Sequence, residues 1–225
     1  MIALVSVPGR PTEKAPPAPP KLLQFSGYEW IVRQDPGSNG GEPHTNRADN
    51  AWVDSHGYLH LRIAWEDGQW TCAEMGMLRS LGYGSYSFTV HNMPKLEPGT
   101  VLGFFTWDDA ESGQNHREMN IELTQWGDPS IKNAQFAVQP YYVPANVFRF
   151  SAPTGPATHS LSWTPGRVSF QTAQGPKTVA AHDFTSGVPS PGAEKIHWKL
   201  YIYGKSRTPQ QKGIEVVIEK FEFLP

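Results

Sequence analysis

Polar and apolar residues alternate over much of this chain, and that alternation constrains its fold more than any other feature. In residues 58–63, YLHLRI, an aliphatic side chain falls on every second position, and residues 84–90, GSYSFTV, repeat the pattern with aromatic and small side chains. A period of two is typical of a β-strand with one buried face. No stretch of twelve residues shows the periodicity of a helix, so we predict an all-β protein.

Further strands and the turns between them indicate the architecture. Residues 101–107 form a continuous apolar run, which predicts a strand buried on both faces. Glycine and proline contribute 21 residues each and cluster between the strand-like segments, as in residues 35–41 and 165–167. Short strands at regular spacing predict an antiparallel β-sandwich or jelly roll. The remaining predicted strands cover residues 133–140, 147–150, 159–163, 168–171, 196–203 and 213–223.

The length of the chain suits one domain preceded by a short tail. Six of the first 20 residues are prolines, which favours polyproline II or disorder over a place in the core. We therefore predict a disordered Pro-rich tail or linker over residues 1–21 and a single jelly-roll domain over residues 22–225. No apolar run approaches the ~18 residues of a membrane-spanning helix, so we expect no transmembrane segment.

Charge and the pattern of metal-binding residues exclude several classes of protein. A balance of 19 basic against 21 acidic side chains gives a net charge of −2 without a basic block, so we expect no nucleic-acid partner. The single cysteine, Cys72, rules out a disulfide framework within the chain and is expected to be a small buried side chain. Because the eight histidines lack the spacing of a zinc site, we expect no metal and no cofactor.

The segment EMNIE at residues 118–122 carries the most chemical information. Side chains alternate across a strand, so Glu118, Asn120 and Glu122 share one face and the apolar residues share the other. Two glutamates whose Cα atoms lie ~13 Å apart can lean together over the shorter residue between them. A gap of about 5–5.5 Å between two carboxyl groups suits retaining glycoside hydrolysis. Solvated surface charges produce the same pattern, so the segment alone leaves both interpretations open.

Two tryptophans flank this acidic strand. Trp107 precedes Glu118 by 11 residues, and Trp126 follows Glu122 by 4. An indole ring can stack on the C–H groups of a sugar face, so both side chains are candidates for a sugar platform. Tryptophan in a β-sandwich is also a common core residue, and the sequence alone does not decide between these roles.

The acidic strand resembles the Glu-x-Asp-x-Glu signature of glycoside hydrolase family 16, which includes laminarinases, lichenases, agarases and carrageenases. Four more segments are similar to motifs of that family and follow its order, so that the resemblance covers roughly residues 22–225. They are GYGSY at 82–86 with AE at 73–74 before it, LGFFTW at 102–107, AQF at 134–136 and HSLSWTPGRV at 159–168. Each motif is short, but five in the right order are specific.

This resemblance implies a concanavalin-A-like jelly roll with an open concave cleft. Carried over by position, Glu118 is the expected nucleophile and Glu122 the general acid/base, with Asn120 between them. Trp107 is expected to shape the sugar site next to the scissile bond. The other expected substrate-binding residues are Glu74, Trp126 and Gln135. Some family members carry a structural calcium, but no EF-hand-like loop is present here.

The chain departs from the family pattern at the centre of the signature. The family has an aspartate where this chain has Asn120, and that aspartate hydrogen-bonds the nucleophile. Asparagine can still donate to Glu118 but carries no charge. We expect the loss of this charge to lower the pKa of Glu122 by roughly one unit. A second departure is Gly76, since many members have an arginine two residues after the glutamate that corresponds to Glu74.

Two main functions fit this combination. The first is a retaining endo-hydrolase of β-1,3- or mixed β-1,3/1,4-glucans, weakened by Asn120. The alternative is a jelly-roll module that binds polysaccharide without cleaving it, and a weaker third hypothesis is a structural or adhesion domain. We expect a monomer whose partner is a polysaccharide. Export to the periplasm, the surface or the medium is inferred only from the substrate class, and no leader is visible in the sequence.

Overall fold

The structure is a computed structural model that describes residues 19–39, 42–206 and 210–225. Most of the predicted Pro-rich tail lies outside the described residues, and the first strand begins at Lys21. Helical structure in the described ranges is limited to single 3-10 turns, and no helix there is long and apolar enough to cross a membrane. These turns are η1 (Ala48–Asn50), η2 (Asn115–Arg117) and η3 (Pro144–Asn146).

Two antiparallel sheets contain most of the strands. The first, here called the cleft sheet, has the spatial order β1 (Lys21–Phe25), β2 (Tyr28–Val32), β7 (Gln69–Met77), β16 (Lys195–Ile202), β9 (Thr100–Trp107), β10 (Met119–Leu123), β11 (Ala134–Val138) and β12 (Val147–Phe150). The second, the outer sheet, has the order β5 (Ala51–Val53), β6 (Leu59–Glu66), β17 (Ile214–Leu224), β8 (Gly84–Asn92), β13 (Ala157–Thr164), β14 (Arg167–Gln174) and β15 (Lys177–Phe184).

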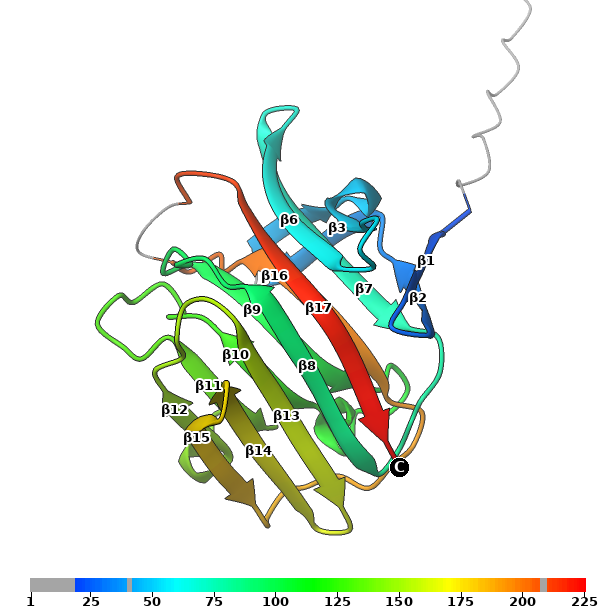
Figure 1. Ribbon diagram of the computed structural model, residues 1–225, viewed down its shortest axis with the longest axis vertical. Coiled ribbons are helices and arrows are strands. Elements are labelled where there is room, and N and C mark those ends of the chain that lie inside the picture. Colours follow the sequence, from blue (N-terminus) through cyan, green and yellow to red (C-terminus); the bar gives the residue numbers. More distant parts are fainter. Residues whose placement is uncertain (1–18, 40–41, 207–209) are drawn as a thin grey trace, which may run out of the picture.

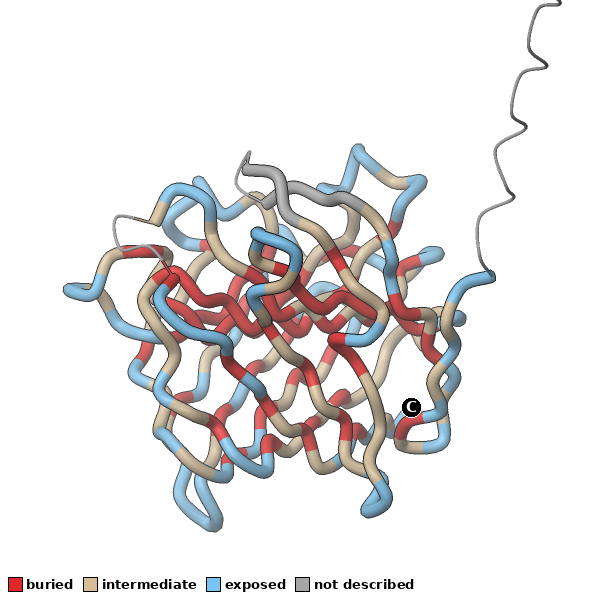
Figure 2. Tube along the Cα trace, turned by 90° about the horizontal axis from the view of Figure 1, so that it is seen from above, coloured by how far each residue is buried: buried red, intermediate tan, exposed pale blue. Residues whose placement is uncertain are grey.

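A hairpin of β3 (Asp35–Asn39) and β4 (Glu42–Asn46) lies at one edge, where β4 pairs in parallel with β7. The two large sheets pack face to face. In Figure 1, β17, β8, β13 and β14 cross the front of the molecule, with β16, β9, β10 and β11 behind them. Figure 2 shows the buried positions gathered between the layers and the exposed ones at the turns. This sandwich confirms the predicted all-β jelly roll.

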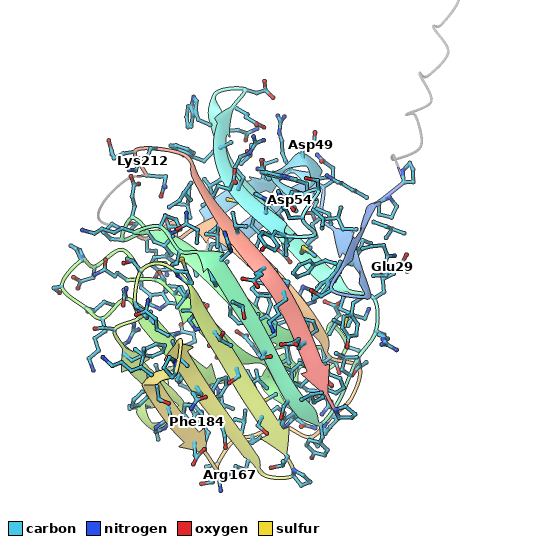
Figure 3. All side chains as sticks on the ribbon, in the orientation of Figure 1. Glu29, Asp49, Asp54, Arg167, Phe184 and Lys212 are labelled. Carbon is cyan, nitrogen blue, oxygen red and sulfur yellow. The ribbon has the colours of Figure 1, made fainter. Side chains whose placement is uncertain are left out.

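The central strands of the outer sheet, β17 and β8, run along much of the molecule in Figure 1. Figure 3 shows Arg167 and Phe184 at one end of this sheet and Lys212, just before β17, at the opposite end. Alternation explains which side faces inward, because β6 and β8 bury every second residue, as their sequences predict. The expected structural role of Cys72 is also confirmed, since its side chain is buried on β7.

Aromatic rings join the two sheets at the centre of the core. Trp198 on β16 contacts Phe88 on β8 at a centroid distance of 4.6 Å and Phe104 on β9 at 4.8 Å. Phe88 and Phe104 also meet directly, at 4.8 Å. All three side chains are buried. Because Phe104 of β9 contacts Phe88 of the opposite sheet, this face of β9 points into the core. The cleft lies on the other face of the strand.

Two core tryptophans differ in their hydrogen bonding, which gives a test of the packing. The indole Nε1 of Trp30 donates to the Phe25 carbonyl at 3.1 Å, whereas that of Trp198 has no acceptor among the described residues. Both side chains are fully buried. We expect Trp30→Phe to cost ~1 kcal/mol more free energy of unfolding than Trp198→Phe, because only Trp30 loses a hydrogen bond. Urea denaturation of both variants measures this difference, and a larger loss for Trp198→Phe would contradict it.

Candidate active site

Strand β10 carries the acidic residues at the middle of the cleft sheet. It pairs with β9 on one side and β11 on the other. The apolar residues 119, 121 and 123 are buried in the core. Asn120 and Glu122 therefore lie on the opposite face, and Glu118, immediately before the strand, follows the same alternation. The shared face predicted from the sequence is confirmed.

A cleft of about 440 Å³ opens on this outward face. It is formed across β7, β16, β9 and β10, with further residues from the segments that follow β2 and β9. Its lining residues are Arg33, Glu74, Gly103, Phe105, Trp107, Asp109, Glu118, Glu122, His197, Lys199 and Tyr201. Both glutamates of the signature, Trp107 and Glu74 thus reach one cleft, as the resemblance implies.

Pairing between strands sets the neighbours of each carboxyl group. Glu122 lies opposite Gly103 on β9 and opposite Gln135 on β11. Gly103 has no side chain, and the ring of Phe105 lies within 3.5 Å of where its Cβ atom would be. Asn120 lies opposite Phe105 and Ala137. The acidic row is therefore bordered by an aromatic ring, a glycine and neutral residues.

Two amide side chains act on the carboxylate of Glu118. Asn120 Nδ2 donates to Glu118 Oε1 at 2.9 Å, as expected from the sequence. Gln139 donates its backbone N–H to the Glu118 carbonyl at 3.1 Å. Burial raises the pKa of Glu118, and the side chains of Asn120 and Gln139 oppose that rise. Sequence reasoning missed Gln139, although it continues the alternation of Gln135 and Ala137 along β11.

Glu122 is bound by a different amide. Gln135 Nε2 donates to Glu122 Oε2 at 2.6 Å, and Trp126 Nε1 donates to Gln135 Oε1 at 3.2 Å. Glu122 is only 8% exposed. Burial, with a smaller contribution from the negative charge of Glu118, raises the pKa of Glu122 to about 8. A high pKa at the acid/base position therefore arises here without a third carboxylate, although Asn120 led us to expect a lowered one.

Glu74 lies at the other end of the cleft in a cluster of cations. Lys199 Nζ lies 2.6 Å from Glu74 Oε2, and Arg33 Nη1 lies 2.7 Å from Glu74 Oε1. Although burial alone would raise it, the pKa of Glu74 is held well below its usual range by His197, Lys199 and Arg33. Glu74 is therefore a permanent carboxylate whose charge is balanced locally.

The packing of the cluster around Glu74 explains why position 76 is a glycine. A Cβ atom added to Gly76 would lie 2.9 Å from Cε1 of His197, so the imidazole fills the space of a side chain there. Arg33, whose backbone N–H donates to the Glu74 carbonyl, places a guanidinium 2.7 Å from the Glu74 carboxylate. Lys199 and His197 were missed in the sequence, although they alternate with apolar residues along β16.

The two tryptophans occupy different places. Trp107 lines the cleft, stacks on His116 at a centroid distance of 4.1 Å and an interplanar angle of 11°, and donates from Nε1 to Asp109 at 3.0 Å. Trp126 packs edge-on against Tyr203 at 5.2 Å and lies outside the residues that line the cleft. Trp126 and Gln135 thus form a hydrogen-bonded chain behind Glu122, whereas Trp107 presents a ring to the cleft.

Metal ligands do not gather at this site. Within residues 19–39, 42–206 and 210–225, no group of three or more His, Cys, Asp or Glu side chains could hold a metal ion. His159 is buried with Nδ1 at 2.8 Å from Thr172 Oγ1, so its role is structural. The chemical groups of the cleft are therefore carboxyls, amides, cations and aromatic rings.

The raised pKa of Glu122 makes the stability of the fold depend on pH. Between the ordinary glutamate value and about 8, the folded chain keeps a proton that the unfolded chain has released, so stability falls as pH rises through this window. Glu122→Gln removes the ionisable group. We expect this variant to be more stable than the parent by at least ~1 kcal/mol at pH 8, with the gain shrinking toward pH 4.5. Thermal unfolding across this range measures the gain, and a gain that is the same at every pH would contradict the assignment.

Comparisons of the sequence find no matching family model and no matching curated protein. Solved structures do match. The β-glucanase of Bacillus licheniformis is 18% identical, with a TM-score of 0.63 over 87% of this chain and 92% of that one. A Bacteroides ovatus mixed-linkage glucan GH16 protein, solved in complex with a G4G4G3G product, is 15% identical, with a TM-score of 0.67 over 87% and 94% of the two chains.

A third similar structure comes from Mycobacterium tuberculosis and is described as an immunostimulatory antigen and pseudo β-1,3-glucanase. It is 18% identical, with a TM-score of 0.63 over 85% of this chain and 88% of that one. Similarity at identities this low establishes the fold alone. The chemistry has to be argued from the residues of the cleft. The chain has the fold of the β-glucanases of glycoside hydrolase family 16, as the five sequence motifs imply.

Proposed function

We propose that this protein is a retaining endo-hydrolase of β-1,3- or mixed β-1,3/1,4-glucans. The observation that carries the proposal is that Glu118 and Glu122 face one cleft in different surroundings. Glu118 accepts a hydrogen bond from Asn120, which together with the Gln139 side chain favours the carboxylate form against the effect of burial. Glu122 has a pKa of about 8 and keeps its proton at neutral pH. A nucleophile and an acid with separated roles are what a retaining glycosidase needs.

In the first step, a carboxylate oxygen of Glu118 attacks the anomeric carbon of the sugar in the cleft. The bond from that carbon to the glycosidic oxygen breaks, and the leaving oxygen takes the proton of Glu122. The product is a glycosyl ester on Glu118 and a carboxylate on Glu122. Asn120 keeps Glu118 Oε1 oriented during the attack through its 2.9 Å hydrogen bond.

In the second step, Glu122 acts as a base. Its carboxylate takes a proton from water, the water oxygen bonds to the anomeric carbon, and the ester bond to Glu118 breaks. Esterification has meanwhile removed the negative charge of Glu118, which is one of the causes of the high pKa of Glu122. The pKa of Glu122 therefore falls during the second step, in which Glu122 must be ionised to act as a base. Its pKa rises again when the ester breaks and Glu118 regains its negative charge.

The shape of the cleft and the similar structures support a β-glucan as substrate. The cleft lies across several strands of the sheet, and Trp107 offers an aromatic face beside Glu118. The similar structures include a lichenase from a mouse hindgut metagenome and a β-1,3-glucanase from Mycobacterium marinum. Because polymeric glucans occur outside the cytoplasm, we also propose that the protein acts outside the cytoplasm.

A second function, polysaccharide binding without cleavage, is favoured by one specific observation. Asn120 cannot carry the charge of the aspartate that the family has between its two glutamates. Its Oδ1 is buried and has no hydrogen-bond partner among the described residues. The similar M. tuberculosis protein is described as a pseudo-glucanase. In this alternative the cleft binds the same chain, but Glu118 does not form the ester.

Hydrolysis distinguishes the two functions. We expect the parent protein to release reducing ends from laminarin, lichenan or barley β-glucan, and we expect Glu118→Gln to lose at least ~10³-fold in rate, because the amide cannot attack the anomeric carbon. Glu29→Gln, an exposed change on β2, serves as the matched control and retains the parent rate. Release of reducing ends at the same rate by Glu118→Gln would contradict the assignment of the nucleophile.

The pH profile tests the role of Asn120. Asn120→Asp places a negative charge beside both glutamates, so the pKa of Glu122 rises further. We expect the alkaline fall of kcat, which reports ionisation of Glu122, to move upward by roughly one pH unit. An alkaline limb at the parent position in this variant would show that residue 120 does not act on Glu122. Cleavage by Asn120→Asp alone would instead establish the binding function for the parent.

A further inference from the structure

A turn that follows β11 carries two of the most exposed large side chains in the described chain. The Val143 N–H donates to the Pro140 carbonyl at 3.2 Å, which makes Tyr141 and Tyr142 the two central residues of a turn. Tyr141 is 67% exposed and Tyr142 is 74% exposed. The rings contact each other edge to face, with centroids 6.1 Å apart and an interplanar angle of 73°.

This turn is tied directly to the nucleophile position. Gln139 Oε1 accepts the backbone N–H of Tyr141 at 2.7 Å, and the same side chain lowers the pKa of Glu118. Gln139 therefore connects Glu118 with the backbone of Tyr141. The Gln139 backbone also donates to the Glu118 carbonyl, which fixes the start of the turn against β10.

The turn and Trp107 lie on opposite sides of Glu118. Trp107 ends β9, and the turn follows β11, while Glu118 immediately precedes β10, which lies between these two strands. Neighbouring strands are ~4.8 Å apart, so β9 and β11 are separated by about 10 Å across the cleavage point. A polysaccharide that crosses the strands past Glu118 thus meets Trp107 on one side and the tyrosine turn on the other.

We propose that Tyr141 and Tyr142 form a second aromatic platform that binds sugar rings of the same polysaccharide chain, beyond Glu118 from Trp107. The proposal rests on the cleft holding a polysaccharide, as proposed above. A tyrosine ring covers the C–H face of a sugar, and its hydroxyl group can exchange hydrogen bonds with sugar hydroxyls. This platform explains why two adjacent aromatic side chains remain exposed in the turn after β11, where exposure of apolar surface otherwise has a cost.

The test measures binding in a protein that does not cleave. In a Glu118→Gln background, calorimetry gives Kd for a disaccharide and a hexasaccharide from laminarin and for a hexasaccharide from lichenan. The variants are the double substitution Tyr141→Ala with Tyr142→Ala, the double substitution of both tyrosines to Phe, and Trp65→Ala. Trp65 is the matched control, because it is also exposed, at 59%, but lies on the β6–β7 hairpin. Circular dichroism checks that each variant is folded.

We expect the double alanine variant to bind the hexasaccharides roughly tenfold more weakly, while its affinity for the disaccharide changes less. The double phenylalanine variant keeps most of the affinity, and Trp65→Ala keeps all of it. Unchanged hexasaccharide binding in the double alanine variant would overturn the platform and leave the proposed hydrolase intact. Tenfold weaker binding in that variant supports the platform even where the parent protein releases no reducing ends. A folded protein that binds none of the three probes would overturn both proposals.

Discussion

Burial of two carboxyl groups without a cation bound to either is the constraint on which this site depends. Strand β10 has the core on one face and the cleft on the other, so the packing that stabilises the sheet limits the contact of Glu122 and of the preceding Glu118 with water. Among the described residues, neither Glu118 nor Glu122 has a salt-bridge partner. Asn120 and Gln135 supply hydrogen bonds but no charge. Proton affinity at Glu122 is therefore set by desolvation first and by the charge of Glu118 second.

The cleft contains cationic side chains, but they are paired with Glu74 and not with Glu118 or Glu122. Lys199 and Arg33 are held by Glu74 on β7, which is separated from β10 by the two strands β16 and β9. Were Lys199 paired with Glu122 instead, that carboxyl group would be ionised at neutral pH and could not act as an acid. Glu74 thus pairs with cations at its own end of the cleft, and Gly76 makes room for the imidazole that completes the cluster.

The acidic strand and the sandwich could be predicted from the sequence, because both depend on alternation along single strands. The shared face of Glu118, Asn120 and Glu122 and the inward faces of β6 and β8 follow from a period of two. Strand β7 was not predicted, because it is buried on both faces and shows no alternation. Gln139, Arg33 and Lys199 were missed because their partners are on other strands, and only the register of the sheet brings them together. The pKa of Glu122 was misjudged because it depends on burial, which a motif does not record.

The stereochemistry of the first product tests the central claim most directly. Glu118 as nucleophile and Glu122 as acid/base require two displacements at the anomeric carbon, so the newly formed reducing end keeps the β configuration. Proton NMR of a β-glucan oligosaccharide, recorded in the first minutes of hydrolysis before mutarotation, distinguishes the two anomers. The account predicts that the β-anomer appears first and the α-anomer grows in later. An α-anomer formed first would contradict a covalent intermediate on Glu118, and with it the division of roles between the two glutamates.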